Sequence, residues 1–103
     1  MPILTLSPKQ SAECYYVTFD FTNVLDDENI SSADVSAIKL SDNSDVTSTI
    51  TDVAKQVVTD TTVKIWLKSG TSGTAYKITC VATCDGTPAS KYEVDALLSV
   101  VDI

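Results

Sequence analysis

Three cysteines, abundant serines and threonines, and scattered carboxylates are the residues of this chain that could do chemistry. Histidine is absent, which excludes Ser-His-Asp and Cys-His catalysis because both need an imidazole as general base. The spacing of Cys80 and Cys84 matches no common zinc motif, and Cys14 lies far away in the sequence. We expect three reduced, structural thiols and no enzymatic activity.

Two further segments could bind a ligand, but a structural interpretation of each is simpler. Asp26, Asp27 and Glu28 could offer oxygens to Ca²⁺, yet no D-x-D-x-D-G pattern is present to supply the roughly six to eight ligands. The SGTSG segment, residues 69–73, lies between two expected strands and not before a helix, so it is no phosphate loop. The sequence predicts a solvated loop and a strand connection, with no metal and no cofactor.

The charge of the chain limits its partners. Seven basic residues stand against 14 acidic ones, which gives a net charge of −7. Nucleic acid and anionic membrane surfaces are therefore poor partners. No apolar run approaches the roughly 20 residues of a membrane-spanning helix, and the N-terminus lacks the pattern of a secretory signal. We expect a protein made and used in a cytoplasm that binds another protein.

The elements that must position these residues are strands, because apolar residues recur at every second position. We expect strands over 13–21, 35–40, 62–67, 76–82 and 92–100, with one or two weak strands over 46–58. In the second strand the apolar phase slips between Ala37 and Ile38, which predicts a bulge there. Asp85-Gly86 is a favoured hairpin turn.

About seven short strands in 103 residues leave no room for crossover helices. They predict an all-β fold, an immunoglobulin-like antiparallel sandwich that forms one domain over residues 1–103, with residues 1–10 as an extended arm. A small barrel is the structural alternative. Cys80 shares a face with Ile78, whereas Cys14 lies on the face opposite Val17, so we predict no Cys14–Cys80 disulfide.

Strand alternation predicts which aromatic and aliphatic residues face the core and which face outward. Tyr76 follows the SGTSG loop, where many sandwich domains have a tyrosine whose hydroxyl bonds back to the loop, so we assign it a structural role. Off-core positions are predicted for Trp66, Tyr16, Leu97, Val81 and Val101. If they gather on one outer surface, they form an apolar patch of the kind that marks a protein contact. Alternatively, Trp66 packs under a neighbouring loop or its strand is buried on both faces.

Four segments add a family resemblance. They occur in the order KQSAECYYVTFDF, DDENISSADVSAI, VKIWLKSGTSGTAYKITC and YEVDALLSVVD. Together they resemble the fiber–tail adaptor proteins of tailed bacteriophages, most closely over residues 65–79. The chain departs from the family where it has Ser36, Ala37 and Ile38 in place of a tryptophan, and residues 42–60 form a longer stretch than usual.

The resemblance implies a virion protein with an immunoglobulin-like fold, present in several copies, that bridges tail or neck connector proteins to tail fibers. It implies no catalytic residue and no cofactor. Loops and sheet edges are then the expected contact elements, and our candidate partner-binding residues are Trp66, Ser69, Gly70, Thr71, Ser72, Gly73, Tyr16 and Leu97.

Two other functions remain open at this stage. Small acidic sandwiches also serve as capsid decoration proteins, which are present in hundreds of copies per particle. A carbohydrate-binding or adhesion module would display a platform of two or three aromatic rings, but Tyr15, Tyr76 and Tyr92 are all expected in the core.

Overall fold

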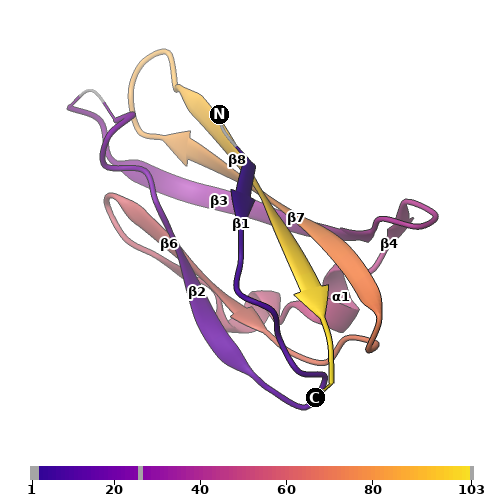
Figure 1. Ribbon diagram of the computed structural model, residues 1–103. Coiled ribbons are helices and arrows are strands. Elements are labelled where there is room, and N and C mark those ends of the chain that lie inside the picture. The colour runs from indigo at the N-terminus through magenta and orange to yellow at the C-terminus, as the bar shows by residue number, and fades with distance from the viewer. Residues whose placement is uncertain (1–2, 26, 103) are drawn as a thin grey trace.

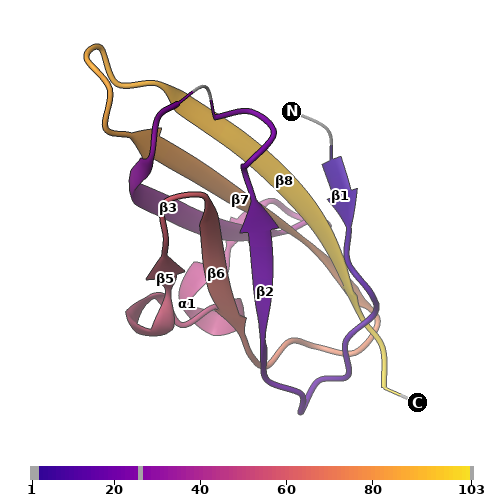
Figure 2. The ribbon, with the colours of Figure 1, turned by 90° about the vertical axis from the view of Figure 1, so that its left-hand side faces the viewer.

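Two β-sheets stacked face to face make up the protein in the computed structural model, which describes residues 3–25 and 27–102 (Figures 1 and 2). The larger sheet has the order β1-β8-β7-β3-β4, with bounds Ile3–Thr5, Lys91–Val100, Thr74–Cys84, Ile30–Lys39 and Ser44–Asp45. The smaller sheet has the order β2-β6-β5, with bounds Tyr15–Asp20, Thr62–Leu67 and Val57–Val58. The predicted all-β sandwich is confirmed, with eight strands in the described ranges instead of about seven.

The strand order corresponds to that of an immunoglobulin sandwich. In such a domain strands B, E and D are neighbours in one sheet and C, F and G in the other. Here β2-β6-β5 have the B-E-D order and β3-β7-β8 the C-F-G order, while β4 lies beside β3. The pairs of neighbouring strands are antiparallel except that β1 runs parallel to β8. The immunoglobulin-like assignment rests on this order.

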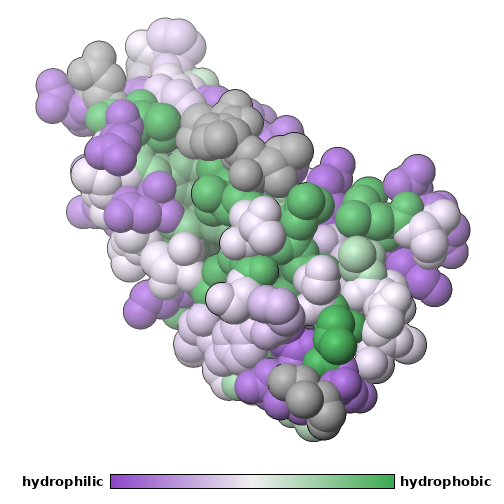
Figure 3. Space-filling view, in the orientation of Figure 1, coloured by the Kyte–Doolittle hydropathy of each residue, from purple (hydrophilic) through white to green (hydrophobic). Residues whose placement is uncertain are grey.

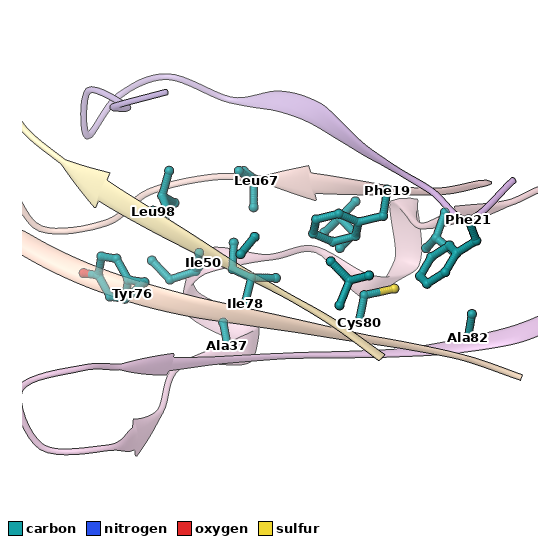
Figure 4. Packing of buried hydrophobic residues seen from close by; sticks show 14 of the residues in the cluster. Phe19, Phe21, Ala37, Ile50, Leu67, Tyr76, Ile78, Cys80, Ala82 and Leu98 are labelled. Carbon is teal, nitrogen blue, oxygen red and sulfur yellow. The ribbon is translucent and has the colours of Figure 1, made fainter. Parts of the chain in front are cut away.

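The core lies between the sheets, where the period-two pattern directs apolar side chains inward (Figure 4). Phe19 and Leu67 of the small sheet face Ile78 and Cys80 of the large one, and each is at most 1 % exposed. Full burial of a large apolar side chain contributes about 1.5–3 kcal/mol, so this alternation is the main reason that these segments form a sandwich. Many of the outward positions carry charged or hydroxyl side chains, such as Thr18, Lys64 and Lys77.

Strand β3 differs from the prediction in its length and in the place of its irregularity. It begins at Ile30, not at residue 35, and its register shifts between Ile30 and Ser32. The predicted bulge between Ala37 and Ile38 is therefore wrong. Ala37 is buried and Ile38 is a half-buried residue of the outer face. The two neighbouring apolar residues therefore point to opposite faces of a regular strand, and no bulge is needed to explain them.

The weak strands expected over 46–58 are mostly wrong. This segment contains helix α1 (Thr47–Ile50) and a 3₁₀ turn, η1 (Val53–Lys55), and only β5 is a strand. The Asp45 carboxylate accepts hydrogen bonds from the backbone and hydroxyl of Thr47, and Asp52 caps η1 through the Ala54 N–H. These local bonds outweigh the strand preference of Thr and Val. Neither helix is long and apolar enough to cross a membrane.

The N-terminal segment follows the large sheet. Its strand β1 pairs with residues 95–97 of β8, and Lys9 bridges to Val100 further along the same strand. Residues 1 and 2 of the predicted extended arm lie outside the described residues. The segment brings Lys9 close to both the SGTSG loop and the C-terminal end.

Candidate functional site

The three cysteines are free, with Cys14 exposed and Cys80 and Cys84 buried. The buried position of Cys80 in β7 agrees with the predicted strand alternation, whereas Cys14 lies just before β2 and not within the strand expected over 13–21. Burial, with a smaller contribution from the charge of Asp34, raises the pKa of the Cys80 thiol to about 12. Cys80 is therefore a neutral side chain that packs in the core and is a poor nucleophile.

The acidic cluster offers little for a cation. Asp26 lies outside the described residues, and Asp27 is an exposed residue with a φ angle of 60°. Across residues 3–25 and 27–102 there is no group of three or more His, Cys, Asp or Glu side chains that could hold a metal ion.

The outer face of the small sheet presents an aromatic pair. Tyr16 of β2 and Trp66 of β6 are directly opposite in the strand register, with their ring centroids 4.9 Å apart and their planes at 74°. The Lys55 ammonium lies 4.9 Å from the Trp66 centroid, and the Lys55 carbonyl accepts a hydrogen bond of 3.0 Å from the Tyr16 hydroxyl. Trp66 is consequently half-buried, whereas Tyr16 is 45 % exposed. Tyr16 thus provides most of the exposed aromatic surface here.

Two exposed valines lie nearby in sequence, one in β5 and one in η1, the turn that also contains Lys55. Val57 pairs with the exposed Lys64 of β6 and is 42 % exposed, and Val53 of η1 is 60 % exposed. We call the group of Tyr16, Val53, Lys55, Val57 and Trp66 the small-sheet face. It combines apolar and aromatic surface with one ammonium group in an acidic protein.

Leu97 lies on a different surface from Trp66. It pairs with Thr5 of β1 and Lys77 of β7, and it alternates with the buried Ala96 and Leu98 on the outer side of the large sheet. The off-core residues that might have formed one patch are therefore divided between the two opposite outer faces of the sandwich. Only Tyr16 and Trp66 come together.

Hydrogen bonds from within the protein hold the backbone of the SGTSG loop. The Thr71 N–H donates to the Tyr76 hydroxyl at 3.0 Å, and the Gly73 N–H donates to the Val100 carbonyl at 2.8 Å. Gly70 has a φ angle of 104°, and a Cβ atom there would lie 2.8 Å from a methyl group of Val100. The loop backbone is thus fixed, while the side chains of Ser69, Thr71 and Ser72 are exposed.

Lys9 is a key residue that the reasoning from sequence missed. Its side chain is fully buried, and its ammonium donates to the carbonyls of Gln10 (2.8 Å), Ser11 (3.3 Å) and Ser69 (2.6 Å). Buried ammonium groups are rare unless their donors are satisfied. Nothing in its sequence position indicates this role, because one of its acceptors, the Ser69 carbonyl, is 60 residues away.

The C-terminal end joins the same arrangement. Asp102 accepts hydrogen bonds from the Ser11 N–H and hydroxyl, which hold the pKa of this carboxyl below its usual value. The Asp102 N–H donates to the Ser72 hydroxyl at 3.0 Å. We call Lys9, Ser11, Ser69, Tyr76 and Asp102 the terminal clasp, because it joins the segment that follows β1 and the residues that follow β8 to the SGTSG loop.

Comparison with known proteins gives one match. Residues 9–96 match the family model described as podophage GP4 fiber-tail adaptor protein gp77. No curated protein and no solved structure matches the chain. The matched range begins at Lys9 and includes the strands of the small sheet and the SGTSG loop. The resemblance found in the sequence is confirmed, and the chain belongs to the podophage GP4 fiber-tail adaptor family, a family of structural proteins of the phage tail.

Proposed function

We propose that this protein bridges the tail or neck connector proteins of a podophage to its tail fibers through protein–protein contacts alone. The observation that carries the proposal is the match of residues 9–96, most of the chain, to the fiber-tail adaptor family. The protein acts in several copies on a symmetric assembly, so that weak individual contacts add up. It joins the particle in the host cytoplasm and has no catalytic activity.

An adaptor needs contact surfaces on different sides, and the sandwich offers them. The small-sheet face lies on one outer surface, while Leu97 lies on the opposite one. The exposed Ser69, Thr71 and Ser72 side chains are at the end of the molecule, on a loop whose backbone is already ordered. Preordered loops bind with a smaller loss of conformational entropy. These features support Trp66, Tyr16, the SGTSG residues and Leu97 as partner-binding residues.

The charge of the protein supports protein partners over other macromolecules. A net charge of −7 is unfavourable next to nucleic acid phosphates or an anionic membrane. The same charge favours partner surfaces that carry lysine and arginine. This balance supports contacts with other tail proteins, without nucleic acid or membrane.

Interrupting the gene in the phage tests the function. Particles assembled without this protein should contain capsid and connector proteins but lack tail fibers, as measured by quantitative mass spectrometry of purified particles. Supplying the protein from a plasmid should restore the fibers. Fibers at normal copy number in the interrupted phage would show that this chain is not the bridge. Normal fibers combined with fragile capsids would indicate a decoration protein.

A further inference from the structure

The four edge strands of the described sheets differ in length and in how they are covered. Strand β2 has six residues, whereas β1 has three and β4 and β5 have two each. Strand β3 extends beyond its short partner β4, but this side is covered by its own chain. The Ala37 N–H donates to the Thr47 hydroxyl at 2.9 Å, and the Ala33 carbonyl accepts from the Gln56 amide at 3.0 Å.

The free side of β2 presents backbone hydrogen-bonding groups. The Phe21 N–H donates to the Thr61 carbonyl at 2.9 Å, in continuation of the β2–β6 register. Backbone groups alternate between the two sides of a strand, so those of Tyr16, Thr18 and Asp20 point away from β6. Within residues 3–25 and 27–102, no strand pairs with this side of β2. The edge is therefore a template for one more strand.

An apolar seam borders this edge. Tyr15 and Val17 point toward the core but are only half-buried. On the same side of the sandwich, Leu4 of β1 pairs with the inward-facing Ala96, yet it is 41 % exposed. Figure 3 shows hydrophobic side chains at the centre of the face over which Figure 1 draws β1 and the nearby part of β2. A strand beside β2 would cover this surface.

The strand order explains why no strand lies beside the free edge of β2 in the described residues. In immunoglobulin constant-type domains the sheet that corresponds to β2-β6-β5 has four strands in the order A-B-E-D, with strand A beside strand B. Here the N-terminal strand β1 pairs with β8 of the other sheet, so the A position beside β2 has no strand from the described part of this chain.

We propose that an extended segment of another virion protein binds at the A position and adds a fourth strand to the small sheet, pairing with Tyr16, Thr18 and Asp20. The inference rests on the proposed adaptor function, because it identifies the edge by which the adaptor binds its partner. A second copy of this chain is disfavoured, since each copy carries a net charge of −7. The segment has about six residues, to match β2, with apolar side chains at alternate positions that cover Tyr15, Val17 and Leu4.

Hydrogen–deuterium exchange tests the strand directly. The wild-type protein is compared free in solution and in purified phage particles, with exchange read by mass spectrometry at the Tyr16, Thr18 and Asp20 amides. These amides should exchange at least about tenfold more slowly in the particle, because they gain hydrogen-bond acceptors. The Val17 and Phe19 amides, which already face β6, are the internal control and should change little.

A matched pair of variants tests the same contact by another route. Thr18→Pro removes an N–H that points away from β6, so the free protein should keep its fold. In particles it should be depleted about tenfold, because one hydrogen bond is lost and the ring obstructs the incoming strand. Thr18→Ala keeps the N–H and should be incorporated normally. Thermal unfolding of both free proteins checks the fold, and the exchange experiment decides if Thr18→Pro does not fold.

The possible outcomes distinguish a failure of the proposed strand pairing at β2 from a failure of the proposed adaptor function. A protein present at the tail whose Tyr16, Thr18 and Asp20 amides exchange as in the free state overturns the strand and leaves the adaptor function standing. A protein absent from the tail overturns both. A dimer in solution that protects the same amides would show that a second copy, not another protein, occupies the edge.

Discussion

The terminal clasp and the free edge of β2 are opposite in character, although the edge and every clasp residue except Asp102 lie in the range that matches the family. In the clasp a buried ammonium, a tyrosine hydroxyl and a carboxylate all bind backbone groups of the same chain. Along β2 the backbone groups of one side have no strand beside them in the described residues. The backbone of the glycine-containing SGTSG loop is thus held by hydrogen bonds within the protein, whereas the outer side of β2 offers backbone N–H and C=O groups to a partner.

The largest loss of stability is expected when the ammonium group of Lys9 is removed from the terminal clasp. Lys9→Met keeps the length of the side chain but leaves three carbonyl partners without their donor. We expect the free energy of unfolding to fall by about 2–4 kcal/mol, measured by urea denaturation. Lys91→Met, at an exposed position, is the control and should change it by less than about 0.5 kcal/mol. Equal stabilities of the two variants would mean that Lys9 does not hold the clasp.

Trp66→Ala tests whether the small-sheet face serves binding rather than folding. The ring is half-buried against Tyr16 and Lys55, so its loss should lower stability by only about 1–2 kcal/mol and leave the protein folded. Incorporation into particles, counted by mass spectrometry, should decrease. A Trp66→Ala protein that assembles normally would remove this residue from the contact surface.

Tyr76→Phe tests whether the Tyr76 hydroxyl holds the SGTSG loop. The change removes the acceptor of the Thr71 N–H and should reduce the free energy of unfolding by about 0.5–1.5 kcal/mol. Tyr92→Phe is a suitable control, because no side-chain hydrogen bond of Tyr92 is present in the described residues. A Tyr76→Phe protein with unchanged stability and unchanged amide exchange in 69–73 would argue against the hydroxyl as a loop anchor.

The smallest expected effect is the response of the clasp to acid. The hydrogen bonds from Ser11 lower the pKa of Asp102, so its contribution to stability is complete above the unfolded-state value of about 3.9 and is lost as the pH falls through the lower folded-state value. The protection factor of the Ser11 amide, which compares its exchange with that of an unfolded chain at the same pH, should therefore fall below pH of about 4. Asp102→Asn should lose this pH dependence, and an equally steep fall of the protection factor in that variant would show that another group causes it.

The sequence contained enough information for the long strands but not for their connections. The alternation of Val63, Ile65 and Leu67 with polar or outward residues predicts that these three side chains are buried, and all three are buried in the structure. The segment after Asp45 was mispredicted because aspartate side chains bound to nearby N–H groups stabilise turns that composition does not reveal.

The candidate site shows the same division. The outward position of Trp66 follows from alternation alone, whereas its stacking with Tyr16 depends on a strand pairing across 50 residues of sequence. The role of Lys9 was invisible because its acceptors include Ser69, a carbonyl 60 residues away. The open side of β2 could not be seen either, since it depends on which sheet the N-terminal segment joins.

The copy number of this protein in the particle tests the adaptor function most directly. Purified phage particles are digested, and the protein is counted against the major capsid protein with isotope-labelled standards. We expect about six to twelve copies per particle, the number of a ring on the tail or neck. Hundreds of copies would contradict it and make this chain a decoration protein of the capsid.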